Sequence, residues 1–316
     1  MRILITGVTG FVGGHLAEML RDDGGELHGT SRGGQWPRPL DHLSSAVRLH
    51  AVDWHDAASV ESVLRATGPD QIYHLAGYAS TGSSFSEPDA AWAGNLGVAQ
   101  SLFDAIAKWG GRPRIVFVTS ALIYAPPVPL DCPIDESGAI SPLSPYAASK
   151  AAADRLAGEM TGLDIVRVRP FNQIGPRQSP QFAIGSFTQQ LARIERGLAP
   201  PKLETGDLTS RRDFTDVRDM ARAYIALMKH GQSGEVYNAG SGTAVALTEI
   251  VKWLRGACQV PVEIVTKAER LRPTDAPVLI ANARKLRAAT GWTPSISLRQ
   301  SVADALDFRR RFDPAA

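Results

Sequence analysis

Over residues 1–170, short apolar runs alternate with amphipathic stretches, and this alternation is the feature that most constrains the fold. The apolar runs predict buried strands, and the stretches between them predict helices, as in βαβ units with a parallel sheet. The predicted strands are 2–6, 26–30, 47–51, 71–75, 115–119 and 165–168, and the predicted helices are 12–22, 57–67, 89–109 and 145–161. Because such crossovers are right-handed, the series predicts a doubly wound α/β fold with helices on both faces of the sheet.

The pattern changes after residue 170, where proline and glycine divide the chain into shorter pieces. A helical periodicity over 214–229 and a predicted short strand at 235–238 nevertheless look like a return to the first domain. Another amphipathic helix is predicted over 246–257, with Thr248 as its N-cap and Glu249 in its first turn. The second half therefore contributes to the first domain and also forms a lobe of its own.

We predict two domains on this basis, because the chain leaves the parallel sheet and later comes back to it. The dinucleotide-binding domain comprises 1–170 and about 215–240, and the smaller, discontinuous C-terminal α/β substrate lobe comprises about 171–214 and 241–316. At 316 residues the chain is long enough to bury a large core.

The composition is that of an ordinary globular protein and argues against several function classes. The formal net charge is only +2, so we expect neither a nucleic-acid nor a membrane partner. Cys132 and Cys258 are far apart in the chain, which indicates reduced thiols and no metal site. The apolar run after Met1 is too short for a signal peptide, and no segment has the length of a bilayer span. We expect a cytoplasmic protein.

A glycine-rich turn, residues 7–13, lies between the first predicted strand and the first predicted helix. In this context Gly7 permits a tight turn, Gly10 lets the backbone approach a pyrophosphate, and Gly13 allows the helix to pack closely on the sheet. The N–H groups and the dipole of the following helix favour an anion. The predicted dinucleotide contacts of this turn are Gly7, Gly10, Phe11, Val12 and Gly13.

The end of the second predicted strand helps to choose between the two nicotinamide dinucleotides. An NAD site usually has an acidic residue there, which binds the ribose 2′-hydroxyl. This chain has Thr30, Ser31 and Arg32 instead, and hydroxyls followed by a guanidinium suit a 2′-phosphate. We therefore expect NADP(H), while a solvated surface position for Arg32 leaves NAD(H) open. Asp53, after the third predicted strand, either accepts a hydrogen bond from the adenine amino group or caps the next helix.

Tyr146 and Lys150 lie one helical turn apart in a predicted helix, so they share one face. An ammonium beside a phenol lowers the pKa of the phenol and suits it to proton transfer. Ser120 follows the predicted strand 115–119, between the glycine turn and this pair in the chain. Together with a dinucleotide-binding turn, this order of residues predicts an enzyme that moves a hydride and a proton.

With these residues in place, the chain resembles the extended short-chain dehydrogenase/reductases that act on nucleotide sugars, over essentially its full length. The segments that carry the resemblance are 7–13, 74–77, Asn95, 119–120, 146–150 and 169–176. Within that family, the segments most similar to GDP-mannose 4,6-dehydratases and GDP-4-keto-6-deoxy-mannose reductases are 29–32, 212–219 and 271–275. The resemblance implies a Rossmann fold and a homodimer formed through the helices 89–109 and 145–161.

The resemblance implies roles for three catalytic residues. Tyr146 would exchange a proton with a sugar oxygen as the hydride moves, Ser120 would hydrogen-bond to that oxygen, and Lys150 would hold the nicotinamide ribose. The further cofactor contacts that it implies are Leu75, Ala76 and Gly77, in addition to Tyr146 and Lys150 themselves. Asn95 either orients the active-site helices or is simply a buried amide with satisfied hydrogen bonds.

The resemblance also implies a nucleotide-sugar site in the second lobe. Asn172 would contact the diphosphate, and Arg212 and Arg272 would clamp phosphate oxygens, a task that suits a guanidinium fork. Asp275, where relatives have Glu, would accept hydrogen bonds from the nucleotide ribose, and Ser84 is a candidate contact to the hexose. Surface ion pairs for the arginines and a turn for Asp275 are the structural alternatives. The GDP-linked substrate follows from the resemblance alone.

One departure from the family pattern narrows the reaction. Dehydratases of the family carry a carboxylate pair, or a Glu two residues past the catalytic Ser or Thr, where this chain has Leu122. A leucine cannot act as acid or base, so a 4,6-dehydratase is disfavoured and NADP(H)-dependent 4-keto reduction of a nucleotide-activated 6-deoxyhexose is favoured. A nucleotide-sugar 4-epimerase (or 3,5-epimerase) is the alternative, because the Ser-Ala-x-x-Tyr arrangement also resembles 4-epimerases. A cofactor-binding sensor without turnover would usually lack Tyr146 or Lys150.

Overall fold

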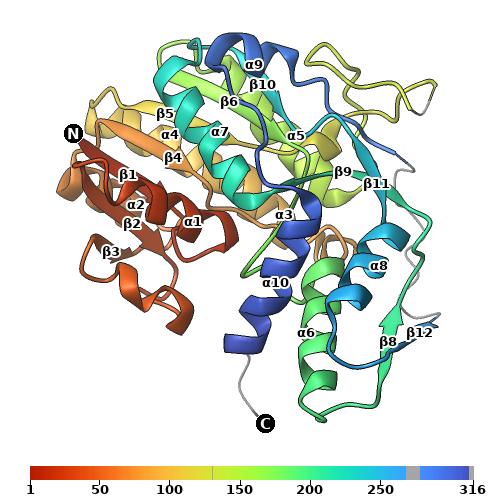
Figure 1. The fold of residues 1–316 in the computed structure, drawn as a ribbon. Helices are drawn as coiled ribbons and strands as arrows, with labels where there is room; N and C mark the ends of the chain where they lie inside the picture. The colour runs from red at the N-terminus through yellow and green to blue at the C-terminus, as the bar shows by residue number, and fades with distance from the viewer. Residues whose placement is uncertain (130, 268–277, 313–316) are drawn as a thin grey trace.

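The computed structural model describes residues 1–129, 131–267 and 278–312. Its main element is a seven-stranded parallel sheet with the strand order β10-β6-β5-β4-β1-β2-β3. The strands are β1 (Arg2–Thr6), β2 (Glu26–Ser31), β3 (Val47–Ala51), β4 (Gln71–His74), β5 (Arg114–Val118), β6 (Asp164–Pro170) and β10 (Val236–Ala239). The strand order reverses between β1 and β4, which confirms the doubly wound α/β fold (Figure 1).

A separate apolar core lies on each face of the sheet, because successive side chains of a strand point to opposite faces. In β1, Ile3 and Ile5 join one core and Leu4 joins the other. The helices are α1 (Phe11–Leu20) and α7 (Val217–His230) on the first face, and α2 (Ala57–Thr67), α4 (Val98–Trp109) and α5 (Pro145–Glu159) on the second. A fully buried aliphatic side chain, such as that of Ile3, Leu4 or Ile5, contributes about 1.5–3 kcal/mol to the stability of the fold relative to an exposed one. The two cores fix the carboxyl ends of the strands as a rigid edge.

A smaller lobe with its own core is built around two small sheets, in the orders β11-β9-β7 and β12-β8. Its strands are β7 (Asn172–Ile174), β8 (Lys202–Thr205), β9 (Arg211–Asp216), β11 (Ala244–Ala246) and β12 (Glu263–Thr266). Its helices are α6 (Ala183–Glu195), α8 (Leu247–Ala257) and α10 (Leu298–Phe312), which lie together at the lower right of Figure 1. Leu191, Leu254 and Leu306 bring the three helices into one core.

The helix predicted over 214–229 begins later than expected. Residues up to Asp216 belong to β9, which pairs with β7 and β11, and α7 begins at Val217. The Asp216 carboxylate caps the helix by accepting a hydrogen bond from the backbone N–H of Arg218 at 2.8 Å. The apolar periodicity did not separate the end of the strand from the start of the helix, because Phe214 is buried in either element.

Two further helices differ from the prediction. The N-cap of α8 is Ala246, which has no side-chain cap, so Thr248 lies inside the first turn and the predicted cap is wrong, while Glu249 does lie in that turn. The predicted helix 89–109 is divided into α3 (Pro88–Trp92), a π-helical turn and α4. π-Helical turns inside helices often occur at functional sites, and this one contains Asn95.

The predicted domain boundary at 241 assigns α9 (Arg284–Thr290) to the second lobe, but α9 packs against α7 and β10. Leu286 and Trp292 belong to the core of the first domain. The indole N–H of Trp292 donates to the backbone carbonyl of Asp219 in α7 at 2.8 Å. The chain thus returns to the first domain a second time.

Candidate active site

A cleft with a volume of about 1270 Å³ lies where the carboxyl ends of the parallel strands meet the second lobe. In open α/β sheets, ligands bind at this edge, at the point where the strand order reverses. Among the described lining residues, the lysine and arginine side chains are Arg32, Lys150 and Arg212, and the carboxylates are Asp53 and Glu87. The cleft therefore offers a positive charge at each end and one in its centre.

The glycine turn forms one wall of this cleft, and its geometry explains two of the three glycines. Gly7 has a φ of +68°, a conformation that side chains with a Cβ rarely adopt. A Cβ on Gly13 would lie 2.4 Å from the carbonyl oxygen of Gly7, so any larger residue would force α1 away from the turn. Gly10 is the N-cap of α1, and no side chain caps the first N–H groups of this helix. The first N–H groups of the helix, beside Phe11 and Val12, therefore face the cleft as an anion site.

Thr6 holds the loop that carries Leu75, Ala76 and Gly77, and sequence reasoning missed it. Its hydroxyl oxygen accepts from the backbone N–H groups of Leu75 at 3.0 Å and Ala76 at 2.9 Å. It also lies 3.1 Å from Nδ1 of His74. Because burial lowers the pKa of His74 to about 3, the ring is neutral and Nδ1 accepts the hydroxyl proton. The sequence feature that could have pointed to Thr6 is a hydroxyl residue at the end of β1, which lies beside β4 in the sheet.

The residues predicted to bind a 2′-phosphate gather at the cleft end beside β2. Thr30 is fully buried, and its hydroxyl accepts from the backbone N–H of Gly7 at 3.3 Å. The Ser31 hydroxyl accepts from the N–H of Gly34 at 2.9 Å, which leaves its proton to donate. Arg32 is exposed at the rim of the cleft. Ser31 and Arg32 thus offer an O–H and a guanidinium side by side.

Asp53 also lines this end of the cleft, and its helix-capping alternative is wrong. The N-cap of α2 is Asp56, whose carboxylate accepts from the N–H of Ala58 at 3.1 Å. The Asp53 carboxylate instead accepts from the N–H of His55 at 2.9 Å, and Asp53 is an exposed residue that lines the cleft. A contact between Asp53 and an adenine amino group is therefore compatible with its position.

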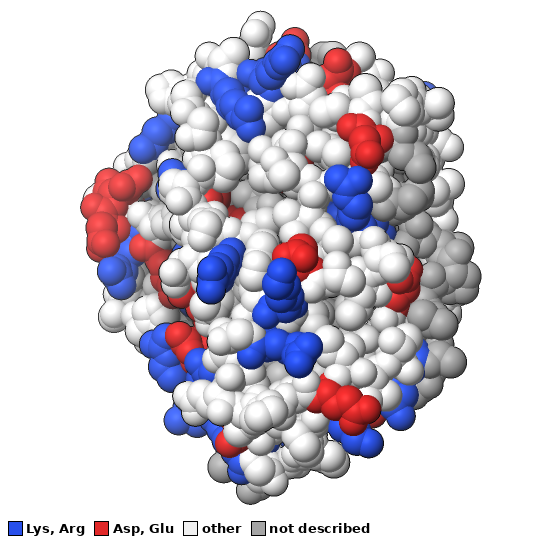
Figure 2. Space-filling model, turned by 45° about the vertical axis from the view of Figure 1, so that its right-hand side comes forward, with Lys and Arg blue, Asp and Glu red and all other residues white. Residues whose placement is uncertain are grey.

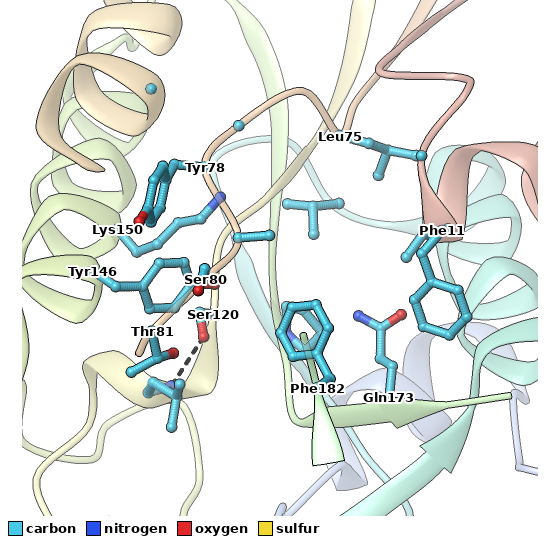
Figure 3. Close-up of a pocket in the computed structure, with 18 of the residues that line it drawn as sticks. Phe11, Leu75, Tyr78, Ser80, Thr81, Ser120, Tyr146, Lys150, Gln173 and Phe182 are labelled. Carbon is cyan, nitrogen blue, oxygen red and sulfur yellow. Dashed lines mark hydrogen bonds between the residues drawn. The ribbon is translucent and has the colours of Figure 1, made fainter. Parts of the chain in front are cut away.

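Ser120, Tyr146 and Lys150 lie together at the centre of the cleft (Figure 3). Tyr146 and Lys150 project from α5, whose N-cap is Ser144. The hydroxyl of Ser144 accepts from the N–H of Ala147 at 3.1 Å. Ser120 follows β5 and caps a short 3-10 turn by accepting from the N–H of Leu122 at 3.1 Å. The hydroxyl of Ser120 accepts this backbone hydrogen bond and still has its own proton to donate within the cleft.

Burial dominates the electrostatics of this group. It raises the pKa of Tyr146, while the neighbouring Ser120 hydroxyl acts in the opposite direction. Burial also lowers the pKa of Lys150 to about 8. The sequence predicted that the ammonium lowers the pKa of the phenol, but burial has the larger influence on that pKa and raises it. Gly77 makes room for the ammonium, because a Cβ there would lie 3.2 Å from Lys150 Nζ.

Asn95 satisfies both interpretations of its role. Its amide nitrogen donates to the Ser149 hydroxyl in α5 at 2.9 Å, and its amide oxygen accepts from the N–H of Tyr78 at 3.1 Å. The side chain is buried, with an exposed fraction of 4%. It is a satisfied amide that fixes the loop after β4 against the helix of Tyr146 and Lys150.

The substrate end of the cleft contains part of the predicted set. Asn172 and Arg212 line it, from β7 and β9. Ser84 does not line it, because Ser84 is fully buried and donates to the carbonyl oxygen of Thr81 at 2.7 Å. Ser80 and Thr81, which point toward Tyr146 in Figure 3, replace it on the wall. The predicted contacts Arg272 and Asp275 lie outside the described residues.

Sequence reasoning also missed the residues that face the catalytic group from the opposite wall. Phe182 and Gln173 lie across from it in Figure 3, with Gln173 beside Phe11, and Gln173 donates to the phenol oxygen of Tyr224 at 3.3 Å. The sequence features that could have pointed to them are the position of Gln173 beside Asn172 and the position of Phe182 just before α6. Leu122 lines the cleft and packs against an apolar cluster that contains Phe171. The position of the dehydratase carboxylate is therefore apolar.

The surface outside the cleft carries interspersed charges. On the face that Figure 2 shows, the blue Lys and Arg side chains alternate with red Asp and Glu on a mostly white surface. Within residues 1–129, 131–267 and 278–312, no cluster of three or more His, Cys, Asp or Glu suits a metal ion. The helices in these ranges also include none long and apolar enough to cross a membrane. Cys132 and Cys258 are both free thiols.

A parallel Rossmann sheet, a glycine turn at a helix N-terminus and a Ser-Tyr-Lys group at one cleft define a short-chain dehydrogenase/reductase. The family model described as GDP-mannose 4,6 dehydratase matches residues 4–305. The chain is 32% identical, over 307 residues, to the GDP-6-deoxy-D-mannose reductase of Pseudomonas aeruginosa, covering 95% of this chain and 94% of the relative. The chain belongs to this family of extended short-chain dehydrogenase/reductases.

Solved structures agree with that assignment. The structure of RMD from Pseudomonas aeruginosa complexed with NADPH superposes with a TM-score of 0.84 at 30% identity and covers 98% of this chain and 99% of that chain. The UDP-glucose 4-epimerase of Thermus thermophilus in complex with NAD superposes with a TM-score of 0.85 at 28% identity and covers 99% of this chain and all (100%) of that one. The protein is therefore an enzyme of the kind that uses a nicotinamide cofactor.

Proposed function

We propose that the protein reduces the 4-keto group of a nucleotide-activated 6-deoxyhexose, linked to GDP, with NADPH. One observation carries this proposal: Ser120, Tyr146 and Lys150 meet in a cleft where Leu122 replaces the carboxylate of a dehydratase. The group is suited to proton transfer at a carbonyl, and Leu122 cannot remove a carbon-bound proton as the carboxylate of a dehydratase would. The similarity to a GDP-6-deoxy-D-mannose reductase supports the same reaction.

The residues of the cleft perform the proton chemistry of this reaction. The glycine turn, Ser31 and Arg32 would hold NADPH, which supplies the hydride when it is bound. Tyr146 donates its phenolic proton to the keto oxygen as negative charge develops there. Ser120 donates a hydrogen bond to the same oxygen and stabilises that charge. Lys150, charged below about pH 8, holds the ribose and favours the phenolate that proton donation leaves.

The cleft end beside β2 supports NADPH over NADH as the cofactor of the proposed reaction. Ser31 and Arg32 present an O–H and a guanidinium there, in place of the acidic residue that binds a ribose 2′-hydroxyl. The P. aeruginosa structure that superposes on this chain is complexed with NADPH, which supports the choice. At the opposite end, Asn172 and Arg212 would hold the diphosphate. A homodimer through α4 and α5 and a cytoplasmic location stay predictions from the sequence.

A nucleotide-sugar 4-epimerase is the second candidate. Its support is the Thermus thermophilus 4-epimerase with NAD, which matches the whole chain. The Ser-Tyr-Lys group serves that reaction too, because an epimerase removes a hydride and returns it to the same carbon. The missing acid at the end of β2 argues against tightly held NAD.

Incubation with GDP-4-keto-6-deoxy-mannose and NADPH separates the two candidates. The reductase consumes NADPH, so absorbance at the nicotinamide band falls in proportion to the GDP-6-deoxyhexose formed. If NADPH persists while a GDP- or UDP-hexose is epimerised with the cofactor retained, the proposed reduction is wrong.

A further inference from the structure

Behind the catalytic group, α5 carries a buried carboxylate that the proposed chemistry does not use. Asp154 follows Tyr146 and Lys150 at helical spacing in α5, so the three residues share one face of the helix. Its exposed fraction is 3%, and it does not line the cleft. A ligand-binding role therefore does not explain why a charge is buried at this position.

The Asp154 carboxylate binds the ends of two strands of the large sheet. One oxygen accepts from the Thr119 hydroxyl at 3.0 Å, at the end of β5. Arg169 of β6 donates to both oxygens, at 3.2 and 2.6 Å, in a bidentate pair. The guanidinium of Arg167 lies 3.3 Å from the second oxygen. The helix is thereby tied to β5 and β6 through a charged network whose central pair, Asp154 and Arg169, is buried.

This network holds the turn of Ser120 from both sides. Thr119 is the residue before Ser120, and its backbone N–H also donates to the carbonyl of Val168 at 2.8 Å. Beyond the turn, the Tyr124 hydroxyl accepts from Arg169 at 2.8 Å. It donates in turn to the amide oxygen of Asn238 at 2.8 Å. The segment that presents Ser120 is therefore fixed to the same carboxylate that fixes the helix of Tyr146.

We propose that Asp154 is a positioning residue, which sets the distance between the Ser120 hydroxyl and the phenol and ammonium groups of α5. The inference rests on the catalytic roles proposed for Ser120 and Tyr146. Burying a carboxylate and a guanidinium is costly, and an apolar pair would often be as stable. The charged network holds the reacting groups in a fixed geometry, which an apolar pair would not do. This geometry matters because displacements of about 1 Å at the reacting oxygen can lower the rate by about 100-fold.

Asp154→Asn tests the proposal against a matched control, Asp219→Asn. Asp219 in α7 is fully buried, accepts from the N–H groups of Ser295 and Ile296 at 2.9 Å, pairs with Arg222, and lies away from the cleft. Both variants should lower the melting temperature. Only Asp154→Asn should lower kcat per folded enzyme, by about 10- to 100-fold, with the Kd for NADPH within about 3-fold of wild type. Equal kcat values for the two variants would overturn the proposal.

Thr119→Val provides a second route if Asp154→Asn does not fold. It removes the hydroxyl that lies within hydrogen-bond distance of both the Asp154 carboxylate and the Val168 carbonyl, and it keeps both buried charges. A kcat loss of about 3- to 10-fold is therefore expected. An unchanged kcat in this variant would contradict the proposal.

A readout that needs no turnover separates this proposal from the proposed function. With ¹³Cζ-labelled tyrosine, the NMR resonance of Tyr146, assigned with Tyr146→Phe, should shift in Asp154→Asn and stay unchanged in Asp219→Asn. The reason is that the neighbouring Ser120 hydroxyl influences the phenol. A Tyr146 resonance that is identical in both variants overturns the positioning role. A wild-type enzyme with no activity on any keto sugar counts against the proposed function alone.

Discussion

The two halves of the cleft are built in different ways. The proposed cofactor half is built mainly from backbone groups: a turn with Gly7 at positive φ, the N-terminus of α1, and the loop after β4 that Thr6 holds. The substrate half uses side chains from elements far apart in the chain, such as Asn172 and Arg212. The catalytic group lies between the two halves. From this difference we predict that cofactor binding depends mainly on glycine geometry, whereas sugar specificity depends on individual side chains.

Tyr146→Phe should have the largest effect and should spare both halves. Loss of the phenolic proton removes the acid, so kcat should fall by about 10³- to 10⁴-fold. The Kd values for NADPH and for GDP should stay within about 3-fold, because neither half changes. Single-turnover kinetics and fluorescence titrations measure the two quantities. Retained turnover would remove Tyr146 from its role.

Gly13→Ala tests the claim that the cofactor half depends on backbone geometry. The added Cβ would lie 2.4 Å from the Gly7 carbonyl oxygen, so the turn and α1 must separate. We expect the Kd for NADPH to rise by about 100-fold, while the Kd for GDP changes little. Gly162→Ala is the control, because a Cβ there meets nothing within 4 Å. Equal NADPH affinity in the two variants would show that the turn is not the binding element.

Arg32→Ala and Arg212→Ala should separate the two halves at the level of single side chains. Removing a charge-assisted contact costs about 1.5–3 kcal/mol, or at least about 10-fold. Arg32→Ala should raise the KM for NADPH by about 10-fold and leave the KM for NADH unchanged. Arg212→Ala should instead raise the KM for the nucleotide sugar. Steady-state kinetics with each substrate varied in turn measure these KM values. A higher KM for the nucleotide sugar in Arg32→Ala, or for NADPH in Arg212→Ala, would contradict the separation of the two halves.

The pH dependence of cofactor binding should show the smallest effect. Burial lowers the pKa of Lys150 to about 8 from its usual 10.5, so the ammonium is charged below pH 8 and loses its charge as pH rises through that value. NADPH is an anion, and its affinity should therefore fall by a few-fold between pH 7 and 9.5. Fluorescence titrations over that range measure the fall. In Lys150→Met the affinity should be lower and independent of pH, and a similar fall in that variant would exclude Lys150 as its source.

The sequence predicted those parts of the molecule that depend on local pattern. The strand and helix periodicities gave the seven-stranded sheet, and the spacings of Gly7 to Gly13 and of Tyr146 to Lys150 pointed to one cleft. These features are readable because one helical turn or one tight turn connects the residues concerned.

Features that depend on long-range contacts could not be predicted from the sequence. Ser84 is buried and held by Thr81, and only the packing of the loop after β4 decides this. Gln173 lines the cleft across from the catalytic group because β7 belongs to the second lobe, which no local pattern indicates. The Asp154–Arg169 pair joins two elements that are adjacent only in the folded sheet, although the helical spacing of Asp154 from Lys150 was visible in the sequence.

The transfer of deuterium tests the central claim most directly. Wild-type enzyme is mixed with GDP-4-keto-6-deoxy-mannose and NADPH deuterated at the nicotinamide C4, and the sugar product is analysed by mass spectrometry and NMR. The account predicts one deuterium at C4 of the sugar for each NADPH oxidised, and none in the Tyr146→Phe control within the same time. A sugar product that forms without deuterium, while the labelled NADPH remains, would contradict it.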